Sequence, residues 1–445
     1  MIFSDQSPLS FQDPLPEACD VVVIGGGIIG TATAYYLARQ GQSVLLCEKG
    51  RIAGEQSSRN WGWVRQQGRD PSELPLMMES LRLWQGLAAE IGESVGFRQT
   101  GSLYLSETPQ EQAKHAAWLN AVAAFQLDSE LLSSRQLGEI LTDRPEQWAG
   151  GALYTASDGR AEPWIAVPAL ARAAQRAGAA LLEACAVRNL DSSDGQIRAV
   201  ITEKGRVRCN RVVLAAGAWT SLFSGNLGID VPQLCVRSTV VQTAPAPNIL
   251  NGQAASHRLA LRRREDGGYS LALGDFSEHF IGPDSFRNFR LFLPSLRIAW
   301  KEVKLRFGGA DFLHDLQRPR RWSADQVTPF EKTRVLNPPA SPRAVALMKR
   351  RLATTFPQLA GLEFRESWAG MIDSSPDILP ILGESDRHRG LILATGLSGH
   401  GFGIGLAVGK LLADLARGKP AAHDINRFRL SRFYDGSPIG LGPAL

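Results

Sequence analysis

The sequence predicts an α/β protein of two domains, one with a parallel sheet and one with an antiparallel sheet. At 445 residues the chain is longer than one hydrophobic core usually serves. Near its start a buried strand, a glycine-rich turn, a helix and a second strand follow one another, as in a βαβ unit. Residues 226–275 instead alternate apolar and polar side chains, which is typical of antiparallel strands.

The composition is that of a globular protein, with 44% hydrophobic and 21% charged residues. No stretch reaches the roughly 20 apolar residues that span a bilayer. The first 18 residues lack the basic and apolar runs of a signal peptide. The five cysteines are scattered, without a CxxC pair. We therefore expect reduced thiols and a cytoplasmic location, with any membrane contact peripheral and at the inner face.

Positive charge is concentrated in one part of the chain. Residues 258–351 hold 19 Lys and Arg against 10 Asp and Glu, whereas the whole chain has a net charge of only +5. A local basic segment predicts a local anionic partner and argues against general nucleic-acid binding. His257, His279 and His314 do not have the spacing of metal ligands, so no metal site is expected.

The N-terminal βαβ unit carries the pattern of a Rossmann-like nucleotide-binding fold. In Gly25-x-Gly27-x-x-Gly30 the first glycine permits a tight turn and the second lets the backbone approach a pyrophosphate. The third lets the helix pack on the strand. Glu48 follows 18 residues after Gly30, where a carboxylate accepts hydrogen bonds from ribose hydroxyls. The predicted strand, helix and second strand are 20–24, 31–41 and 43–49.

The glycine motif alone does not distinguish an NAD site from an FAD site. Glu48 argues against NADP, whose extra phosphate prefers a nearby Arg. Two later features favour FAD: the apolar strand of 212–220, which ends in small residues, and the glycine-rich loop Thr395–Gly405, which leads into a helix. The N-terminus of that helix would stabilise negative charge on a reduced flavin ring. The alternative is that the second loop is only a tight corner between helix and strand.

Other elements are predicted from periodicity. Residues 72–95 should form a helix, because apolar residues recur on one face. That face holds Leu76, Met77, Leu81, Trp84 and Leu87. The remaining predicted elements are helices at 165–178 and 402–416 and strands at 205–209, 212–219 and 390–395.

These motifs together resemble the D-amino acid oxidase superfamily of FAD-dependent flavoproteins, from about Asp20 to Phe433. The segments that carry the resemblance are VVVIGGGIIGTATAYYLARQG, IAGEQSSRNWGWVRQ, VVLAAGAWT, WAGMIDSSPDILPILG and GLILATGLSGHGFGIG. IAGEQSSR, TEKGRVRCNRVV and FPQL are most similar to the L-amino acid deaminases. SSRNWGWVRQ, ESLRLWQGL and the GHG loop look more like the sarcosine oxidase beta-subunit type.

The resemblance implies FAD-binding roles for residues in several parts of the chain. The first three glycines would hold the pyrophosphate, Glu48 the adenosine ribose, and the serine-rich loop would pass the flavin. Some relatives tether FAD to a C-terminal cysteine, but the last cysteine here is Cys235, so we expect non-covalent, dissociable FAD. The implied cofactor residues are Gly25, Gly27, Gly30, Glu48, Ser57, Ser58, Arg59, Asn60, Val187, Gly217, Trp219, Gly399, Gly401 and Phe402.

Two residues are candidates for catalysis. The resemblance aligns Arg262 with the arginine that binds the substrate carboxylate in the deaminases, and a planar guanidinium suits a carboxylate. The alternative is that Arg262, Arg263 and Arg264 form the solvated end of a hairpin. His400, in the glycine-rich loop, is expected to contact the flavin or to tune the amine; the alternative is a structural role.

A basic segment at 284–307 is predicted to be an amphipathic helix, interrupted at Pro294. Such a segment can lie in a bilayer interface. The deaminases carry an insertion at the corresponding place, associated with membrane contact and with electron transfer to the respiratory chain. The alternative is a lid over the active site with a solvated basic face. The apolar face consists of Phe286, Phe289, Leu293, Leu296, Trp300, Val303 and Phe307.

We expect a discontinuous FAD-binding domain and a substrate domain that contains the basic insert. Trp63, Arg65 and Gln66, after the flavin-passing loop, are expected to line the substrate pocket. The FAD-binding domain is predicted at 18–65, 150–225 and 366–433, the substrate domain at 66–149 and 226–365, and the insert at 276–330.

The resemblance implies FAD-dependent oxidative deamination of an amino acid, with the L form favoured. A hydride would pass to flavin N5, and hydrolysis of the imino acid would give a 2-oxo acid and ammonia. Oxygen or a membrane quinone would accept the electrons. The alternative within the family is a sarcosine-type oxidase or dehydrogenase of N-alkyl or cyclic secondary amino acids. A third hypothesis is an electron-transfer or regulatory flavoprotein subunit with no substrate of its own.

Overall fold

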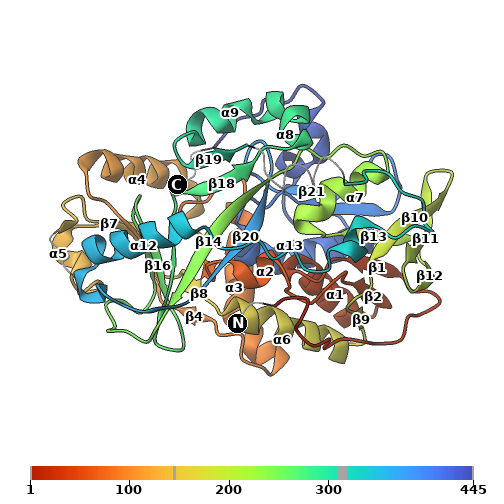
Figure 1. The fold of residues 1–445 in the computed structure, drawn as a ribbon, viewed down its shortest axis with the longest axis horizontal. Coiled ribbons are helices and arrows are strands. Elements are labelled where there is room, and N and C mark those ends of the chain that lie inside the picture. Colours follow the sequence, from red (N-terminus) through yellow and green to blue (C-terminus); the bar gives the residue numbers. More distant parts are fainter. Residues whose placement is uncertain (1–2, 144–146, 308–317, 443–445) are drawn as a thin grey trace.

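The computed structural model describes residues 3–143, 147–307 and 318–442 and contains two large sheets (Figure 1). One has six strands in the order β21-β22-β13-β1-β2-β9. The other has ten, in the order β19-β18-β14-β17-β16-β15-β5-β7-β6, with β20 paired to β14. Figure 1 places β1, β2 and β13 towards one end of the molecule and β7 and β16 towards the other. The predicted α/β fold is confirmed, with one mainly parallel and one mainly antiparallel sheet.

The six-stranded sheet is parallel except for β21. Three of its strands, β1, β2 and β22, are buried at every residue, as expected of a parallel sheet covered on both faces. Its strands are β1 (Val21–Ile24), β2 (Val44–Cys47), β9 (Ala180–Leu182), β13 (Arg211–Leu214), β21 (Ile381–Glu384) and β22 (Leu391–Thr395). Parallel strands end at the same edge of a sheet. The residues that follow β1, β2, β13 and β22 therefore meet there, although they come from distant parts of the sequence.

Helices pack closely against this sheet and against one another. The helix α13 (Gly401–Ala416) contacts both α1 (Ile28–Arg39) and α3 (Leu74–Ile91). A Cβ on Gly405 would lie 2.6 Å from Ile28, and one on Gly409 would lie 2.4 Å from Ala32, so these glycines permit the close approach of α13 to α1. The predicted apolar face of α3 is buried, and α6 (Pro163–Arg176) covers α1.

Two long strands run across the middle of the molecule (Figure 1). β14 (Leu234–Thr243) pairs antiparallel with β20 (Phe364–Ser374) along its whole length. The division into a discontinuous FAD-binding domain and a substrate domain remains our proposal, and its boundary at 366 falls within β20. The ten-stranded sheet also contains β5 (Ser102–Leu105), β6 (Ser129–Leu132), β7 (Ala152–Thr155), β15 (Gln253–Ala255), β16 (Ala260–Arg263), β17 (Tyr269–Ala272), β18 (Ser277–Phe280) and β19 (Val303–Arg306).

Smaller elements complete the described chain. The short strands β3 (Trp63–Val64), β8 (Gly159–Arg160) and β4 (Arg98–Gln99) form one small sheet. β10 (Val187–Ser193), β11 (Gln196–Thr202) and β12 (Gly205–Arg208) form another. Further α-helices are α2 (Gln56–Arg59), α4 (Pro109–Ala121), α5 (Ser134–Leu137), α7 (Thr220–Asn226), α11 (Pro329–Lys332) and α12 (Pro342–Thr355).

The prediction of an amphipathic helix over 284–307, interrupted at Pro294, is wrong at Pro294 and after residue 299. Residues Pro283–Arg287 form α8 and Phe289–Ala299 form α9, which contains Pro294 without ending there. Residues Val303–Arg306 instead form β19, because the edge strand β18 offers backbone partners in parallel register. The part of the predicted insert at 308–317 lies outside the described residues. Within the described chain, no helix combines the length and the apolar character that crossing a bilayer requires.

Candidate functional site

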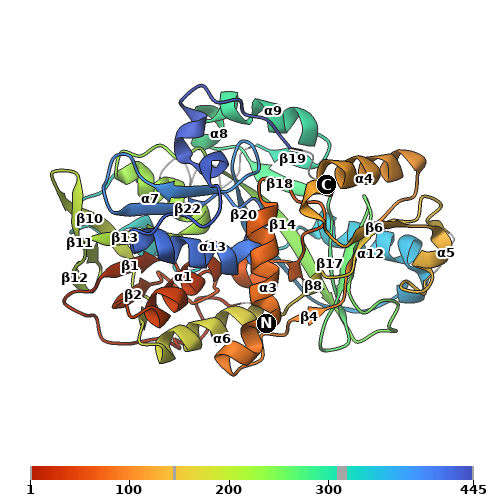
Figure 2. The same ribbon diagram turned by 180° about the vertical axis from the view of Figure 1, so that it is seen from behind.

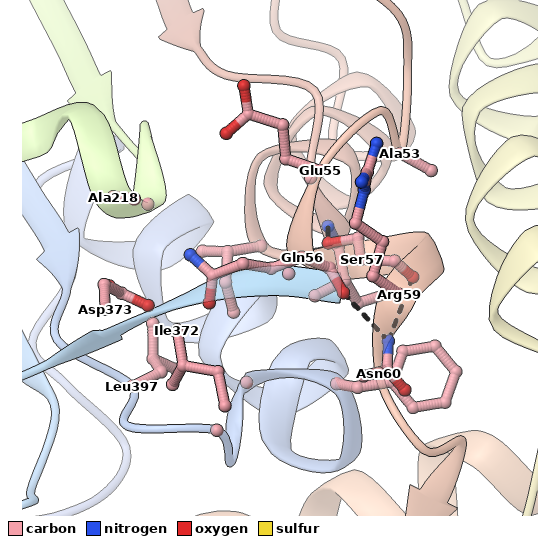
Figure 3. Close-up of a pocket in the computed structure, with 18 of the residues that line it drawn as sticks. Ala53, Glu55, Gln56, Ser57, Arg59, Asn60, Ala218, Ile372, Asp373 and Leu397 are labelled. Carbon is pink, nitrogen blue, oxygen red and sulfur yellow. Dashed lines mark hydrogen bonds between the residues drawn. The ribbon is translucent and has the colours of Figure 1, made fainter. Parts of the chain in front are cut away.

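A large cavity lies at the edge where the parallel strands end. Its walls come from the turn after β1, the loop that contains α2, the loop after β13, the strand β20 and the loop before α13. Figure 3 shows part of this cavity, with Gln56 and Ser57 of α2 on one side and Ile372, Asp373 and Leu397 on the other. Segments far apart in the sequence thus enclose one site.

The glycine-rich turn leaves no room for side chains. Gly25 has a φ of +110°, and a Cβ there would lie 2.4 Å from the carbonyl oxygen of Ala215. A Cβ on Gly30 would lie 1.9 Å from the carbonyl oxygen of Gly25. Gly25 and Gly27 line the cavity, whereas Gly30 packs beneath the turn. The backbone at the N-terminus of α1 is therefore exposed to the cavity, in the geometry that suits a pyrophosphate.

Glu48 lies at the end of β2 and lines the cavity. Its Oε2 accepts a hydrogen bond from the Gly26 amide, and its Oε1 accepts one from the Gly50 amide, both at 2.7 Å. Burial raises the pKa of this carboxyl group, while Lys49 and the two amides oppose the shift. Glu48 thus joins the glycine-rich turn to the end of β2, the position expected of the ribose-binding carboxylate.

The predicted flavin-passing loop forms the short helix α2, and three of its four candidate residues line the cavity. Ser57 accepts a hydrogen bond from the Ile28 amide at the start of α1. Asn60 donates to the carbonyl oxygens of Gln56 and Ser57 (Figure 3). Arg59 donates to the carbonyl oxygens of Gly54 and Ala369, so it fixes the loop to β20. Ser58 is fully buried and does not line the cavity.

The later candidate residues reach the same cavity from other segments. Trp219 donates through Nε1 to the Glu55 carboxylate, at 2.9 and 3.0 Å. Phe402 packs on Trp84, with ring centroids 5.0 Å apart. The cofactor candidates that line the cavity from the middle and end of the chain are Val187, Gly217, Trp219, Gly399, Gly401 and Phe402.

Asp373, on β20, lines the cavity and was not identified from the sequence. Its Oδ2 accepts hydrogen bonds from the Gly396 amide (2.7 Å), from Thr395 Oγ1 and from Gln233 Nε2. Burial raises the pKa of Asp373, while hydrogen bonds from the Gly396 amide, Gln56 and Thr395 oppose the shift. The side chain therefore fixes the loop after β22 to β20. Its only sequence signal was its place in the WAGMIDSSPD segment.

Two arginines, Arg65 and Arg69, also line the cavity. Arg65 has its guanidinium 5.3 Å from the ring centre of Tyr104 and 5.9 Å from that of Trp63. Arg69 is only 3% exposed, and its buried Nη1 has no hydrogen-bond partner among the residues that the structure describes. Burial, followed by repulsion from Arg65, lowers the pKa of Arg69 to about 10. An anion in this part of the cavity would satisfy the unpaired donor and offset both positive charges.

Of the pocket residues expected after the flavin-passing loop, Trp63 and Arg65 line the cavity. Gln66 does not line it. The backbone N–H of Gln66 donates to the Asp158 carboxylate, and its side-chain Nε2 donates to Ser157 Oγ. Arg69 was missed because it follows a further turn, and its burial depends on packing that the sequence does not report. Among the described residues, no cluster of three or more His, Cys, Asp or Glu side chains could hold a metal ion.

His400 lines the cavity at the N-terminus of α13. Its Nδ1 lies 3.1 and 3.2 Å from the two carboxylate oxygens of Glu73. Glu73 is completely buried at the start of α3. Burial, with the nearby Arg69, lowers the pKa of His400. The sequence singled out His400 but gave no sign of its partner.

The structure does not bring Arg262 to the cavity, in contrast to its expected place as a carboxylate anchor. Its guanidinium donates two hydrogen bonds to the Glu162 carboxylate, at 2.9 and 3.0 Å, and both side chains are buried. A Cβ on Gly62 would lie 2.9 Å from the Arg262 guanidinium, so this pair packs beneath the loop that carries Trp61 and Trp63. The alternative, that Arg262 is the solvated end of a hairpin, is also wrong, because the Arg262 side chain is buried and paired with Glu162.

The glycine cradle, the helix N-terminus and the carboxylate after β2 fit a dinucleotide, and these features define a dinucleotide-binding α/β protein. A family model described as FAD dependent oxidoreductase matches residues 20–415. The chain belongs to this family of FAD-dependent oxidoreductases.

Solved structures of similar proteins share the fold over nearly the whole chain. The chain is 29% identical to the L-amino acid deaminase from Proteus myxofaciens, with a TM-score of 0.92, covering 97% of this chain and 100% of that one. It is 26% identical to the L-proline dehydrogenase from P. horikoshii, with a TM-score of 0.76, covering 95% and 99%.

Curated relatives are of two lengths. The chain is 26% identical to the mitochondrial sarcosine dehydrogenase of Mus musculus over 95% of this chain but 43% of that protein. It is also 26% identical to the glycine oxidase of Geobacillus kaustophilus, covering 93% of this chain and 97% of that protein. The chain thus spans less than half the length of the mitochondrial dehydrogenases that it matches and nearly all of the glycine oxidase.

Proposed function

We propose that the protein oxidises the C–N bond of an amino acid, L in configuration, to an imino acid that water converts into a 2-oxo acid and ammonia. One observation carries this proposal: the partly unpaired, buried Arg69 lies in the same cavity as the dinucleotide cradle. A cation with an unsatisfied donor beside a flavin site suits the carboxylate of a small substrate. The names of the deaminase and oxidase relatives agree with this substrate class.

Different residues of the chain would bind the cofactor and the substrate. Bound FAD would supply the acceptor for a hydride, and we expect it to be held without a covalent bond. Gly25, Gly27 and the N-terminus of α1 would bind its pyrophosphate. Arg69, with Arg65, would bind the substrate carboxylate in the place expected of Arg262. A fixed carboxylate orients the α-hydrogen, and orientation lowers the barrier by several kcal/mol.

Apolar side chains on the substrate side would receive the rest of the amino acid. Val240, Leu273, Ile372 and Leu397 line the cavity together with Trp61 and Trp63. Because the cavity offers these apolar side chains besides Arg65 and Arg69, a monocarboxylic amino acid with an uncharged side chain suits it best.

An anaerobic titration tests the proposed function. Purified protein with bound FAD is mixed with separate D-, L- and N-methyl amino acids, and absorbance in the flavin band is followed. Bleaching by L-amino acids, with ammonia and 2-oxo acid as products, supports the proposal. Bleaching by N-methyl substrates with formaldehyde as product would establish the sarcosine-type alternative. No bleaching by any member of the panel would favour a flavoprotein subunit without a substrate.

The electron acceptor and the membrane contact belong to the same proposal. We expect oxygen or a membrane quinone to reoxidise the flavin. Around α8, α9 and β19, apolar side chains are unusually exposed: Phe286 is 70%, Trp300 63% and Phe307 78% exposed. Arginines and lysines, including Arg290 and Arg297, lie between them. Such a surface suits peripheral contact with an anionic membrane, at the inner face, close to a quinone.

A further inference from the structure

We propose that Glu73 is a positioning residue, which fixes His400 as the acceptor of a proton from the ammonium group of the substrate. This inference rests on the proposed oxidation of an amino acid. An amino acid in neutral solution carries an ammonium group, which has no lone pair. The lone pair is needed to form the C=N bond as the hydride leaves, so a proton must first move to a base in the cavity.

The geometry fixes which nitrogen of His400 carries hydrogen. An ionised carboxylate only accepts hydrogen bonds, so the Nδ1 atom, 3.1 Å from Glu73 Oε2, must be protonated to bond it. In the neutral imidazole, Nε2 then has the lone pair. Nε2 has no hydrogen-bond partner among the described residues, while His400 lines the cavity. We infer that Nε2 faces the cavity and offers it an acceptor.

The fold holds this pair rigidly. Glu73 precedes α3, His400 precedes α13, and the two helices are in contact, with α3 running across one end of α13 (Figure 2). Ser80 Oγ and Trp84 Nε1, both on α3, donate to the carbonyl oxygen of Gly403 at 2.7 and 3.0 Å. These buried hydrogen bonds fix the helices in register, so the carboxylate and the imidazole cannot separate without breaking the packing.

The charges around the pair favour an ionised Glu73 and a neutral His400. Burial acts to raise the pKa of Glu73, but His400, Arg69 and Arg65 together lower it by more, so the pKa lies below its usual value. Burial lowers the pKa of His400, and the charges of Arg69 and Arg65 act in the same direction, against Glu73. When the ring takes a proton, the adjacent carboxylate balances the new charge.

The resulting step conserves atoms and charge. One N–H proton of the substrate ammonium moves to Nε2 of His400, which leaves a neutral amine and an imidazolium paired with Glu73. With FAD bound as the hydride acceptor, the amine lone pair would become the second C–N bond as the α-hydrogen leaves with its two electrons. The imidazolium later returns its proton to water.

The test replaces Glu73 with Gln, which keeps the shape but removes the charge. The amide can donate to Nδ1, so the ring hydrogen would move to Nε2 and the acceptor would be lost from the cavity. We expect anaerobic flavin reduction to slow by about 100-fold, the scale of general base catalysis. In parallel, ¹⁵N NMR of histidine-labelled protein with FAD, with the signal assigned by His400→Asn, should report Nδ1–H in the wild type and Nε2–H in Glu73→Gln.

Asp377→Asn is the matched control, because Asp377 is a buried carboxylate that pairs with Arg432 away from the cavity. It should lower the thermal unfolding temperature but leave the rate of flavin reduction and the His400 signal unchanged. Retention of the flavin spectrum by Glu73→Gln would exclude misfolding as the cause of a slow reaction. An unchanged rate, or Nε2–H in the wild type, would overturn the inference. If no amino acid reduces the wild-type flavin, the proposed function fails, and the NMR result still decides the tautomer.

Discussion

Arg262 and Glu162 form a two-point ion pair, with Nη1–Oε1 at 2.9 Å and Nη2–Oε2 at 3.0 Å, and neither side chain reaches the cavity. The pair supports the loop of Trp61 and Trp63 from behind, through contact with Gly62. A residue expected to bind substrate thus has a structural partner instead, and we propose Arg65 and Arg69 as the anchor in its place.

Loss of Glu162 should destabilise the fold. In Glu162→Gln the buried Arg262 keeps its charge without a balancing carboxylate, and breaking a buried pair in this way costs about 3–5 kcal/mol. Urea denaturation followed by circular dichroism measures the change. The double variant Arg262→Met, Glu162→Met should recover part of the loss. If Arg262 were the substrate anchor, Arg262→Met would raise KM while leaving the denaturation midpoint unchanged.

Arg69→Met should weaken substrate binding. Removal of a charged hydrogen-bond donor to the carboxylate costs about 1.5–3 kcal/mol, so kcat/KM should fall about 10- to 100-fold. Steady-state kinetics with the best amino acid of the panel measures this. Arg172→Met is the control, since Arg172 forms a largely exposed pair with Glu93 and should not change kcat/KM. An equal kcat/KM for Arg69→Met and Arg172→Met would rule out Arg69 as the anchor of the substrate carboxylate.

Activity should depend on pH through His400. Only the neutral ring can accept the substrate proton, so kcat/KM should fall as the pH drops through the pKa of His400. Burial and Arg69 lower this pKa below the usual value of about 6.5, so the acidic limb should lie below pH 6.5. His400→Asn should abolish this limb together with most of the activity. An acidic limb that persists in His400→Asn would assign the titration to another group.

The glycine cradle should be intolerant of a single methyl group. In Gly30→Ala the new Cβ would lie 1.9 Å from the Gly25 carbonyl oxygen, which forces the turn away from α1. We expect the purified variant to lack FAD. The wild type should contain FAD, and denaturing it should release the FAD into a filtrate, because the cofactor is held without a covalent bond. Gly86→Ala is the control, because a Cβ there meets nothing within 4 Å. A yellow, fully loaded Gly30→Ala protein would contradict the proposed cradle.

The exposed apolar surface of α8, α9 and β19 should bind anionic vesicles. Flotation with phosphatidylglycerol vesicles should recover the protein, whereas neutral phosphatidylcholine vesicles should not, because the surface combines apolar and basic side chains. Phe286→Ser with Trp300→Ser should reduce the recovery at least tenfold without changing the rate of flavin reduction by a soluble substrate. Tyr434→Ser, at an exposed aromatic residue elsewhere, should bind as well as the wild type.

Local patterns predicted most of the nucleotide half of the protein. The strand β1, the turn of Gly25 and the strand β2 were identified because their signals lie within a few residues of each other. The segment of β19 was predicted as helix, although its apolar spacing suits a helix or a strand. Pairing with the neighbouring strand β18 is what makes it a strand.

The sequence by itself determined that a βαβ unit would form and that its glycines would leave the backbone exposed, because backbone geometry depends on adjacent residues. The tertiary structure alone decided the partners of the charged side chains. Glu162 and Arg262 lie 100 positions apart, and Glu73 and His400 lie 327 apart. No local pattern reports such a pairing, since it depends on which buried charges the packing of distant helices and strands brings into contact.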